Sequence, residues 1–67
     1  MTNLVIDAAS DKIFFSIMKD SKSYTTEHSN SRENFDKIMS LLNKFLIEKD
    51  TNIRQIKKIY VNKGPGK

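Results

Sequence analysis

Hydrophobic residues in the first half of the chain form short runs or alternate with polar ones, a pattern typical of strands. Residues 4–6 are a continuous apolar run, as expected for a strand covered on both faces. Residues 13–18 alternate and place Ile13, Phe15 and Ile17 on one face. Residues 23–27 are rich in β-branched and aromatic residues but carry little apolar surface. We therefore expect a hairpin followed by a third strand at one edge of a sheet.

The hydrophobic period changes after residue 30 and predicts one helix over residues 30–49. Asn30 and Glu33 have the spacing of a capping box, in which side chains satisfy the free N–H groups at a helix start. Apolar residues then recur at the period of a helix, and we expect this stripe to cover the sheet. Its members are Phe35, Ile38, Met39, Leu42 and Leu46.

A fourth strand is predicted over residues 56–61, after Thr51-Asn52 interrupts the helix. A strand–helix–strand crossover is right-handed, and it places this strand parallel to the first one. We expect both strands to be buried, with Leu4, Ile6, Ile59 and Val61 in the core. The resulting class is α/β: a β-β-β-α-β unit with a mixed sheet and one main helix.

The apolar stripe of the predicted helix is wider than one sheet needs. Leu41 and Phe45 extend it to roughly 160° of arc. Two interpretations stay open. The two side chains pack under a neighbouring element of the same fold, or they form half of a helix-to-helix interface with another protein. In the second case the interface comprises Ile38, Leu41, Leu42 and Phe45.

Composition narrows the class of protein. A chain of 67 residues buries only about 60% of its unfolded surface, so its stability is expected to be marginal. The absence of cysteine excludes disulfides and thiolate metal sites. The net charge of +4 favours an anionic partner only slightly, because most lysines are scattered. No apolar run approaches the roughly 20 residues of a membrane span, and we predict a soluble, untargeted protein without a membrane partner.

Candidate chemical groups are few. Asp7 closes the first strand, where ligands bind open α/β sheets, and its carboxylate could hold a metal-bound phosphate. We favour the alternative that Asp7 caps the turn by accepting N–H groups from Ser10 or Asp11. No second carboxylate or histidine stands at a spacing that completes a metal site, and no glycine-rich phosphate loop or nucleophile motif is present. We expect no catalytic residue, metal or cofactor.

The other candidates are favoured as structural residues. His28 is the only histidine and lies between polar residues, which favours a solvated loop position. Tyr24 and Tyr60 lack the interleaved basic residues of a base-stacking platform, so we assign both to packing of the sheet.

Two short motifs carry a resemblance to a known family. Residues 4–9 read Leu-Val-Ile-Asp-Ala-Ala, and residues 61–66 read Val-Asn-Lys-Gly-Pro-Gly. They are similar to the Leu-X-Ile-Asp-Thr-Ser and Val-X-X-Gly-Pro-Gly segments of the TsaB (YeaZ) family of tRNA threonylcarbamoyladenosine biosynthesis proteins, which have a ribonuclease H-like, actin-like ATPase fold. The family's Thr and Ser are replaced by Ala8 and Ala9, its frequent helix histidine by Asn34, and the serine after Gly66 by Lys67.

The resemblance covers the whole of this chain but only about the first third of a family member. It implies that residues 1–67 are a single truncated domain, the N-terminal half-lobe of the fold. It also implies a family motif at Gly64, Pro65 and Gly66, and a degenerate phosphate-loop position at Asp7.

The implied function is a non-catalytic scaffold or interaction subunit in the modification of the adenosine beside the tRNA anticodon. By the same analogy the protein is cytoplasmic, pairs through its helix with a TsaD-type enzyme or with itself, and meets tRNA indirectly. Three alternatives stay open: a small basic nucleic-acid-binding module using Lys57, Lys58 and Lys63, a phosphotransferase half-lobe with a metal on Asp7, and an inactive truncated fragment.

Overall fold

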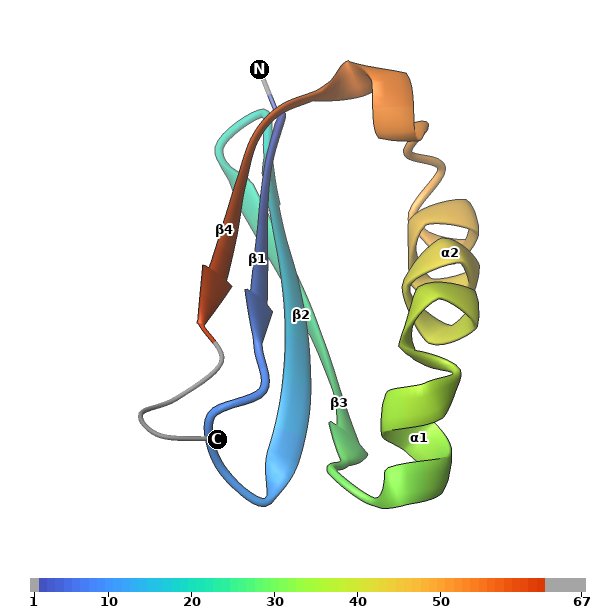
Figure 1. Ribbon diagram of the computed structural model, residues 1–67. Coiled ribbons are helices and arrows are strands. Elements are labelled where there is room, and N and C mark those ends of the chain that lie inside the picture. The colour runs from blue at the N-terminus through green and yellow to red at the C-terminus, as the bar shows by residue number, and fades with distance from the viewer. Residues whose placement is uncertain (1, 63–67) are drawn as a thin grey trace.

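The computed structural model describes residues 2–62, which form a mixed sheet with helices on one face (Figure 1). The strands are β1 (Thr2–Asp7), β2 (Lys12–Lys19), β3 (Lys22–Ser29) and β4 (Ile56–Asn62). Between β3 and β4 lie α1 (Arg32–Asp36), α2 (Ile38–Glu48) and a short 3-10 helix, η1 (Ile53–Gln55). The motif residues Gly64, Pro65 and Gly66 fall outside the described residues.

The sheet has the order β3-β2-β1-β4. β2 runs antiparallel to both of its neighbours, whereas β1 and β4 are parallel. This confirms the predicted α/β class, the edge position of the third strand and the parallel pairing of the first and fourth strands. The β2–β3 hairpin turns through Asp20 and Ser21, whose φ angles are 50° and 68°. Two positive φ angles give a turn that matches the right-handed twist of the strands.

The core lies between the sheet and α2. The alternation in β2 is confirmed, because Ile13, Phe15 and Ile17 are all fully buried. Leu4 of β1 joins them from the sheet, and α2 contributes Leu42, Phe45 and Leu46.

The single helix predicted over residues 30–49 is wrong in its first part, because two helices meet at Lys37. Lys37 has φ −114° and ψ 28°, which lie outside the helical region. The N-cap is Ser31, whose hydroxyl accepts a hydrogen bond from the Asn34 amide at 3.1 Å. The predicted capping box of Asn30 and Glu33 does not form. The side chain of Asn30 is instead hydrogen-bonded to the β1–β2 turn.

α2 ends close to the predicted position, at Glu48. Asp50 adopts a left-handed φ of 50° and donates its amide to the Ile47 carbonyl, at 3.0 Å. The amide of Thr51 donates to the Leu46 carbonyl at 2.9 Å. These two bonds form a Schellman motif, which satisfies the last carbonyls of the helix and turns the chain toward β4.

The orientation of α2 differs from the predicted one. Phe45 is 2% exposed and Leu42 4%, and Ile38 and Leu41 are half-buried against the core. The candidate interface of Ile38, Leu41, Leu42 and Phe45 therefore does not form the exposed face of the helix. The interpretation that Phe45 packs within the same fold is the one that the structure supports.

Two residues assigned to the sheet-covering stripe are exposed instead. Phe35 is 56% exposed and Met39 69%. The stripe is too wide to face one sheet entirely, and α2 is rotated so that Phe45 faces inward while Met39 lies on its flank.

Only part of the predicted burial of the parallel strands holds. Leu4 is fully buried and Ile6 packs partly against the core, but Ile59 and Val61 are 53% and 56% exposed. Both lie on β4, the strand at the edge of the sheet farthest from β3. The core side chains come from β1, β2 and α2, so the helices leave much of β4 uncovered.

Candidate functional site

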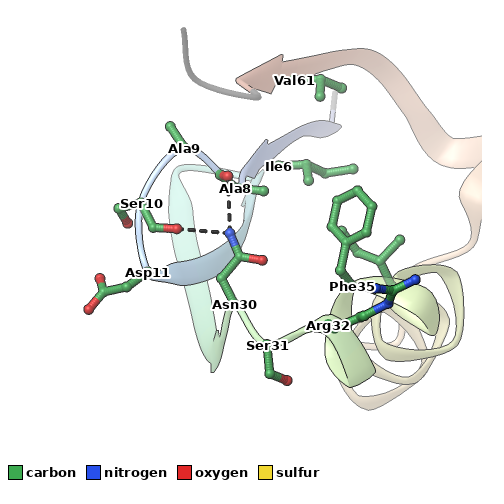
Figure 2. A pocket seen from close by; sticks show the side chains of 11 residues that line it. Ile6, Ala8, Ala9, Ser10, Asp11, Asn30, Ser31, Arg32, Phe35 and Val61 are labelled. Carbon is green, nitrogen blue, oxygen red and sulfur yellow. Dashed lines mark hydrogen bonds between the residues drawn. The ribbon is translucent and has the colours of Figure 1, made fainter. Parts of the chain in front are cut away.

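A hollow lies at the C-terminal ends of the parallel strands, between the β1–β2 turn and α1 (Figure 2). Its volume is about 970 Å³. Apolar walls come from Ile6, Phe35, Ile38 and Val61, whereas Ala8, Ser10, Asp11 and Asn30 line the turn side. This is the end of an α/β sheet at which ligands commonly bind.

Asn30 joins the two loops on the turn side of the pocket. Its side-chain amide donates to the carbonyls of Ala8 and Ser10, at 3.2 and 2.8 Å (Figure 2). Its backbone amide donates to the carbonyl of Asp11 at 2.8 Å. One residue thus fixes the β1–β2 turn against the end of β3, and the shape of the pocket depends on it.

Asp7 belongs to the same turn but does not line the pocket. Its Oδ1 accepts a hydrogen bond from the Ala9 amide at 3.1 Å. The favoured expectation of a turn-capping carboxylate is confirmed, although its partner is Ala9 rather than Ser10 or Asp11. Among residues 2–62, no three acidic, histidine or cysteine side chains are grouped so that they could hold a metal ion.

Charge at the pocket comes from Arg32 of α1 and Asp11 of the turn. The apolar wall stands opposite: Figure 2 shows Phe35 reaching from α1 toward Ile6, with Val61 beyond it. A pocket with an apolar wall and one guanidinium is suited to binding an amphipathic group. It is less suited to acid–base catalysis. Sequence reasoning missed this set of residues, because Asn30 had the pattern of a helix cap and Phe35 that of a core residue.

One ion pair joins β2 and β3. Lys12 Nζ and Glu27 Oε2 are 2.7 Å apart, and both side chains are about half exposed. The hydrogen bond to Glu27, reinforced by its charge, raises the pKa of Lys12 above its ordinary value of 10.5. Charge-assisted bonds of this kind favour the protonated form of the lysine.

Other candidate residues are placed apart from the pocket. His28 lies on β3 opposite Ile13, and its ring centroid is 5.9 Å from that of Phe15, so the expectation of a solvated loop is wrong. Tyr24 is half-buried, with Lys49 Nζ 5.3 Å from its ring centroid, as expected for a residue that packs on the sheet. Tyr60 is 50% exposed, which does not support its predicted role in the packing of the sheet.

The basic residues of the nucleic-acid alternative are only partly described. Lys57 and Lys58 are exposed on β4, whereas Lys63 lies outside the described residues. None of the helices in residues 2–62 is long and apolar enough to span a membrane.

Comparisons with known proteins bear on the fold. No protein-family model and no curated protein matches the chain. YeaZ from Pseudomonas aeruginosa matches it with a TM-score of 0.84 and 15% sequence identity. The match covers 98% of this chain and 31% of YeaZ. A second solved structure, a protein described as similar to peptidase YeaZ from the same organism, matches with the same values.

At this low identity the likeness establishes the fold. The chain spans less than a third of the length of the YeaZ structures that it matches. Over residues 2–62 the chain therefore has the fold of the part of YeaZ that it matches, which is the predicted half-lobe of an actin-like ATPase fold.

Proposed function

We propose that this chain is a non-catalytic interaction subunit in tRNA threonylcarbamoyladenosine modification and that it pairs with a TsaD-type enzyme. The observation that carries the proposal is the match to YeaZ over nearly the whole chain. The motifs at residues 4–9 and 61–66 resemble the same family, independently of the fold. Under this proposal the chain works in the cytoplasm, holds no cofactor and meets tRNA only through its partner.

A partner surface is available on the helices, although not at the residues that the sequence favoured. Phe35, Met39 and Ile47 are between 56% and 69% exposed. Fully burying an apolar side chain of this size contributes about 1.5–3 kcal/mol. Association costs offset much of the combined gain, so these side chains support a complex of moderate affinity.

The non-catalytic role fits the chemistry of the strand end. The carboxylate of Asp7 already accepts a hydrogen bond from the Ala9 amide, and Asp7 does not line the pocket. Transfer of a phosphoryl group needs metal ions and several positioned charges around the phosphate. We therefore expect Asp7→Asn to leave the function of the subunit intact.

Reconstituted tRNA modification tests the proposal. A TsaD-type enzyme from the same organism is supplied with its substrates, with and without the chain, and threonylcarbamoyladenosine is measured by mass spectrometry of digested tRNA. We expect the product to increase when the chain is present, with equal increases for the parent chain and Asp7→Asn. No increase would contradict the interaction role, and loss only in Asp7→Asn would favour the phosphotransferase alternative.

The nucleic-acid alternative has a separate readout. Lys57→Glu with Lys58→Glu reverses two exposed charges on β4. Under the proposed function this variant binds tRNA no differently from the parent chain in the absence of the enzyme. Tight tRNA binding by the parent chain alone, abolished in this variant, would favour a nucleic-acid-binding module.

A further inference from the structure

We infer that the edge of β3 pairs with the same edge of a second copy of this chain, so that the two sheets continue into one another. The pairing is antiparallel and is centred on Thr25. β3 lies at the edge of the sheet opposite β4, because β2 and β1 stand between them. The inference rests on the backbone and side chains of β3, and it holds whether or not the helices bind a TsaD-type enzyme.

The ladder between β2 and β3 determines which backbone groups of β3 point outward. The Asn30 amide donates to the Asp11 carbonyl at 2.8 Å, and this pair continues the register that joins Lys12 to Ser29. Hydrogen-bonded and non-hydrogen-bonded pairs alternate along an antiparallel ladder. Counting back from Asn30, every second residue bonds to β2, and the residues between them point their N–H and C=O groups away from it. These outward residues are Ser23, Thr25, Glu27 and Ser29.

Three of the outward residues leave their backbone groups unpaired. The Ser29 carbonyl accepts a hydrogen bond from the Asn34 side chain at 2.9 Å, where the chain turns into α1. Within residues 2–62, nothing bonds to the outward N–H or C=O groups of Ser23, Thr25 and Glu27, which we call the open edge. Each of these residues offers one donor and one acceptor. A further strand laid along β3 would satisfy all of them.

The middle of β3 lacks the features that commonly protect an edge strand. Prolines, bulges and unpaired charges keep such edges apart in other proteins. β3 contains no proline, and its register with β2 is unbroken over its whole length. The charge in its middle part, on Glu27, is paired with Lys12 at 2.7 Å. The open edge is therefore suited to pairing with another strand.

The spacing of the open edge favours a second copy as that strand. Its three residues are symmetric about Thr25. When Thr25 of one copy faces Thr25 of an antiparallel copy, the Ser23 backbone bonds to the Glu27 backbone of the second copy, and the reverse also holds. Each copy then satisfies every open group of the other. Such self-complementarity is what an interface across a two-fold axis needs.

Side chains favour the same register. Tyr24 pairs with the buried Ile17 and so faces the helix layer, whereas Thr25 points to the opposite face of the sheet. Pairing about Thr25 places threonine opposite threonine on one face and Tyr24 opposite Thr26 on the other. Both kinds of cross-strand pair are stabilising. A register centred on Glu27 would instead bring two carboxylates directly opposite one another, which is destabilising.

Hydrogen exchange of the full chain, followed by NMR at increasing protein concentration, tests the pairing residue by residue. The amides of Tyr24, Thr26 and His28 bond to β2 within one chain, so we expect them to be protected at every concentration. The amides of the open edge are expected to gain protection only as the chain dimerises. When about 90% of the chains are paired, their exchange should slow about tenfold, because only the unpaired chains exchange freely.

Sedimentation equilibrium measures the dimerisation itself. A single pair of strands makes a small interface, so we expect a weak dimer that forms between about 10 μM and 1 mM. The average mass should rise with concentration from the 7.8 kDa of one chain toward twice that value.

Opposite charges at Thr25 test both the register and the identity of the partner. Thr25→Lys and Thr25→Glu each bring like charges face to face in a dimer, and we expect either to weaken dimerisation about fivefold or more. A mixture of the two variants should associate again, because lysine then faces glutamate. Ser16→Lys is the control, since Ser16 pairs with Thr25 from β2 and lies one strand farther from the edge. Its two charges would be about 14 Å apart and screened, so we expect a change below about twofold.

Removal of one backbone donor gives an independent test. Thr25→Pro deletes the N–H at the centre of the open edge, and an edge strand tolerates proline where its N–H faces outward. Thr25→Val is the control, because it also loses the 3.0 Å hydrogen bond to the Ser16 hydroxyl but keeps the backbone N–H. We expect dimerisation to weaken about tenfold in Thr25→Pro and to change less than about twofold in Thr25→Val. Circular dichroism establishes that each variant is folded, and the charged variants retain the test if Thr25→Pro unfolds.

Three outcomes would overturn the inference. A chain that stays monomeric up to about 1 mM would remove the second copy as the partner. A dimer that persists unchanged in both Thr25→Lys and Thr25→Glu would place the interface elsewhere on the chain. Protection of the open edge that does not depend on concentration would mean that these amides are satisfied within one chain.

Discussion

Phe45 of α2 stacks on Phe15 of β2, with ring centroids 6.1 Å apart and ring planes 27° from parallel. Both side chains are almost completely buried. This contact joins the helix layer to the centre of the sheet and fixes which side of α2 faces inward. It also removes Phe45 from the surface available to a partner.

Phe45→Ala is expected to destabilise the chain by about 3–5 kcal/mol, because it leaves a cavity in the core. In a domain of this size that loss approaches the whole free energy of unfolding. Phe35→Ala is the matched control, since Phe35 is 56% exposed, and its effect is expected to be about 1 kcal/mol or less. Urea titration followed by circular dichroism compares the two. An equal loss of unfolding free energy in the two variants would contradict the burial of Phe45 in the core.

Asn30→Ala should destabilise the chain by about 1–3 kcal/mol, because the carbonyls of Ala8 and Ser10 lose a shared donor. Asn43→Ala removes the same group from an exposed position on α2, and it is expected to be neutral or slightly stabilising. Hydrogen exchange of the β1–β2 turn amides gives a second readout, and faster exchange is expected only in Asn30→Ala. Unchanged exchange there would contradict the role of Asn30 in holding the turn.

The sequence predicts most of the topology of the sheet, but it predicts less well which side chains of the helices and of β4 are exposed. Alternation of Ile13, Phe15 and Ile17 determines the inner face of β2, because strand side chains point to opposite faces in turn. The crossover rule places β4 parallel to β1. Both inferences depend on local pattern or chain handedness, which the sequence contains.

Orientation within the helix layer could not be predicted in the same way. An apolar stripe of about 160° allows several rotations of a helix on a sheet. The stacking of Phe45 on Phe15 selects one of them, and these two residues are 30 positions apart in the sequence. The pocket residue Asn30 was missed for a similar reason, since its partners are 20 and 22 positions away in the sequence.

The pH dependence of one ion pair can be predicted with its sign. The hydrogen bond to Glu27 raises the pKa of Lys12 above 10.5 in the folded chain. The stability that this pair contributes is present in full below pH 10.5 and is lost as the pH rises through the raised pKa of Lys12. We expect an NMR titration of the Lys12 side chain to show the raised pKa in the parent chain and a value near 10.5 in Glu27→Gln. The same pKa in both would mean that the pair does not persist in solution.

Complex formation with a TsaD-type enzyme tests the central claim most directly. Sedimentation velocity of the mixed proteins is expected to show a complex heavier than either component. Because the exposed flank of the helices is the proposed partner surface, Met39→Glu should weaken the complex by about tenfold or more, and Tyr60→Glu should leave it unchanged. Two separate boundaries at every concentration tested, with a folded chain, would contradict the claim that this chain is an interaction subunit.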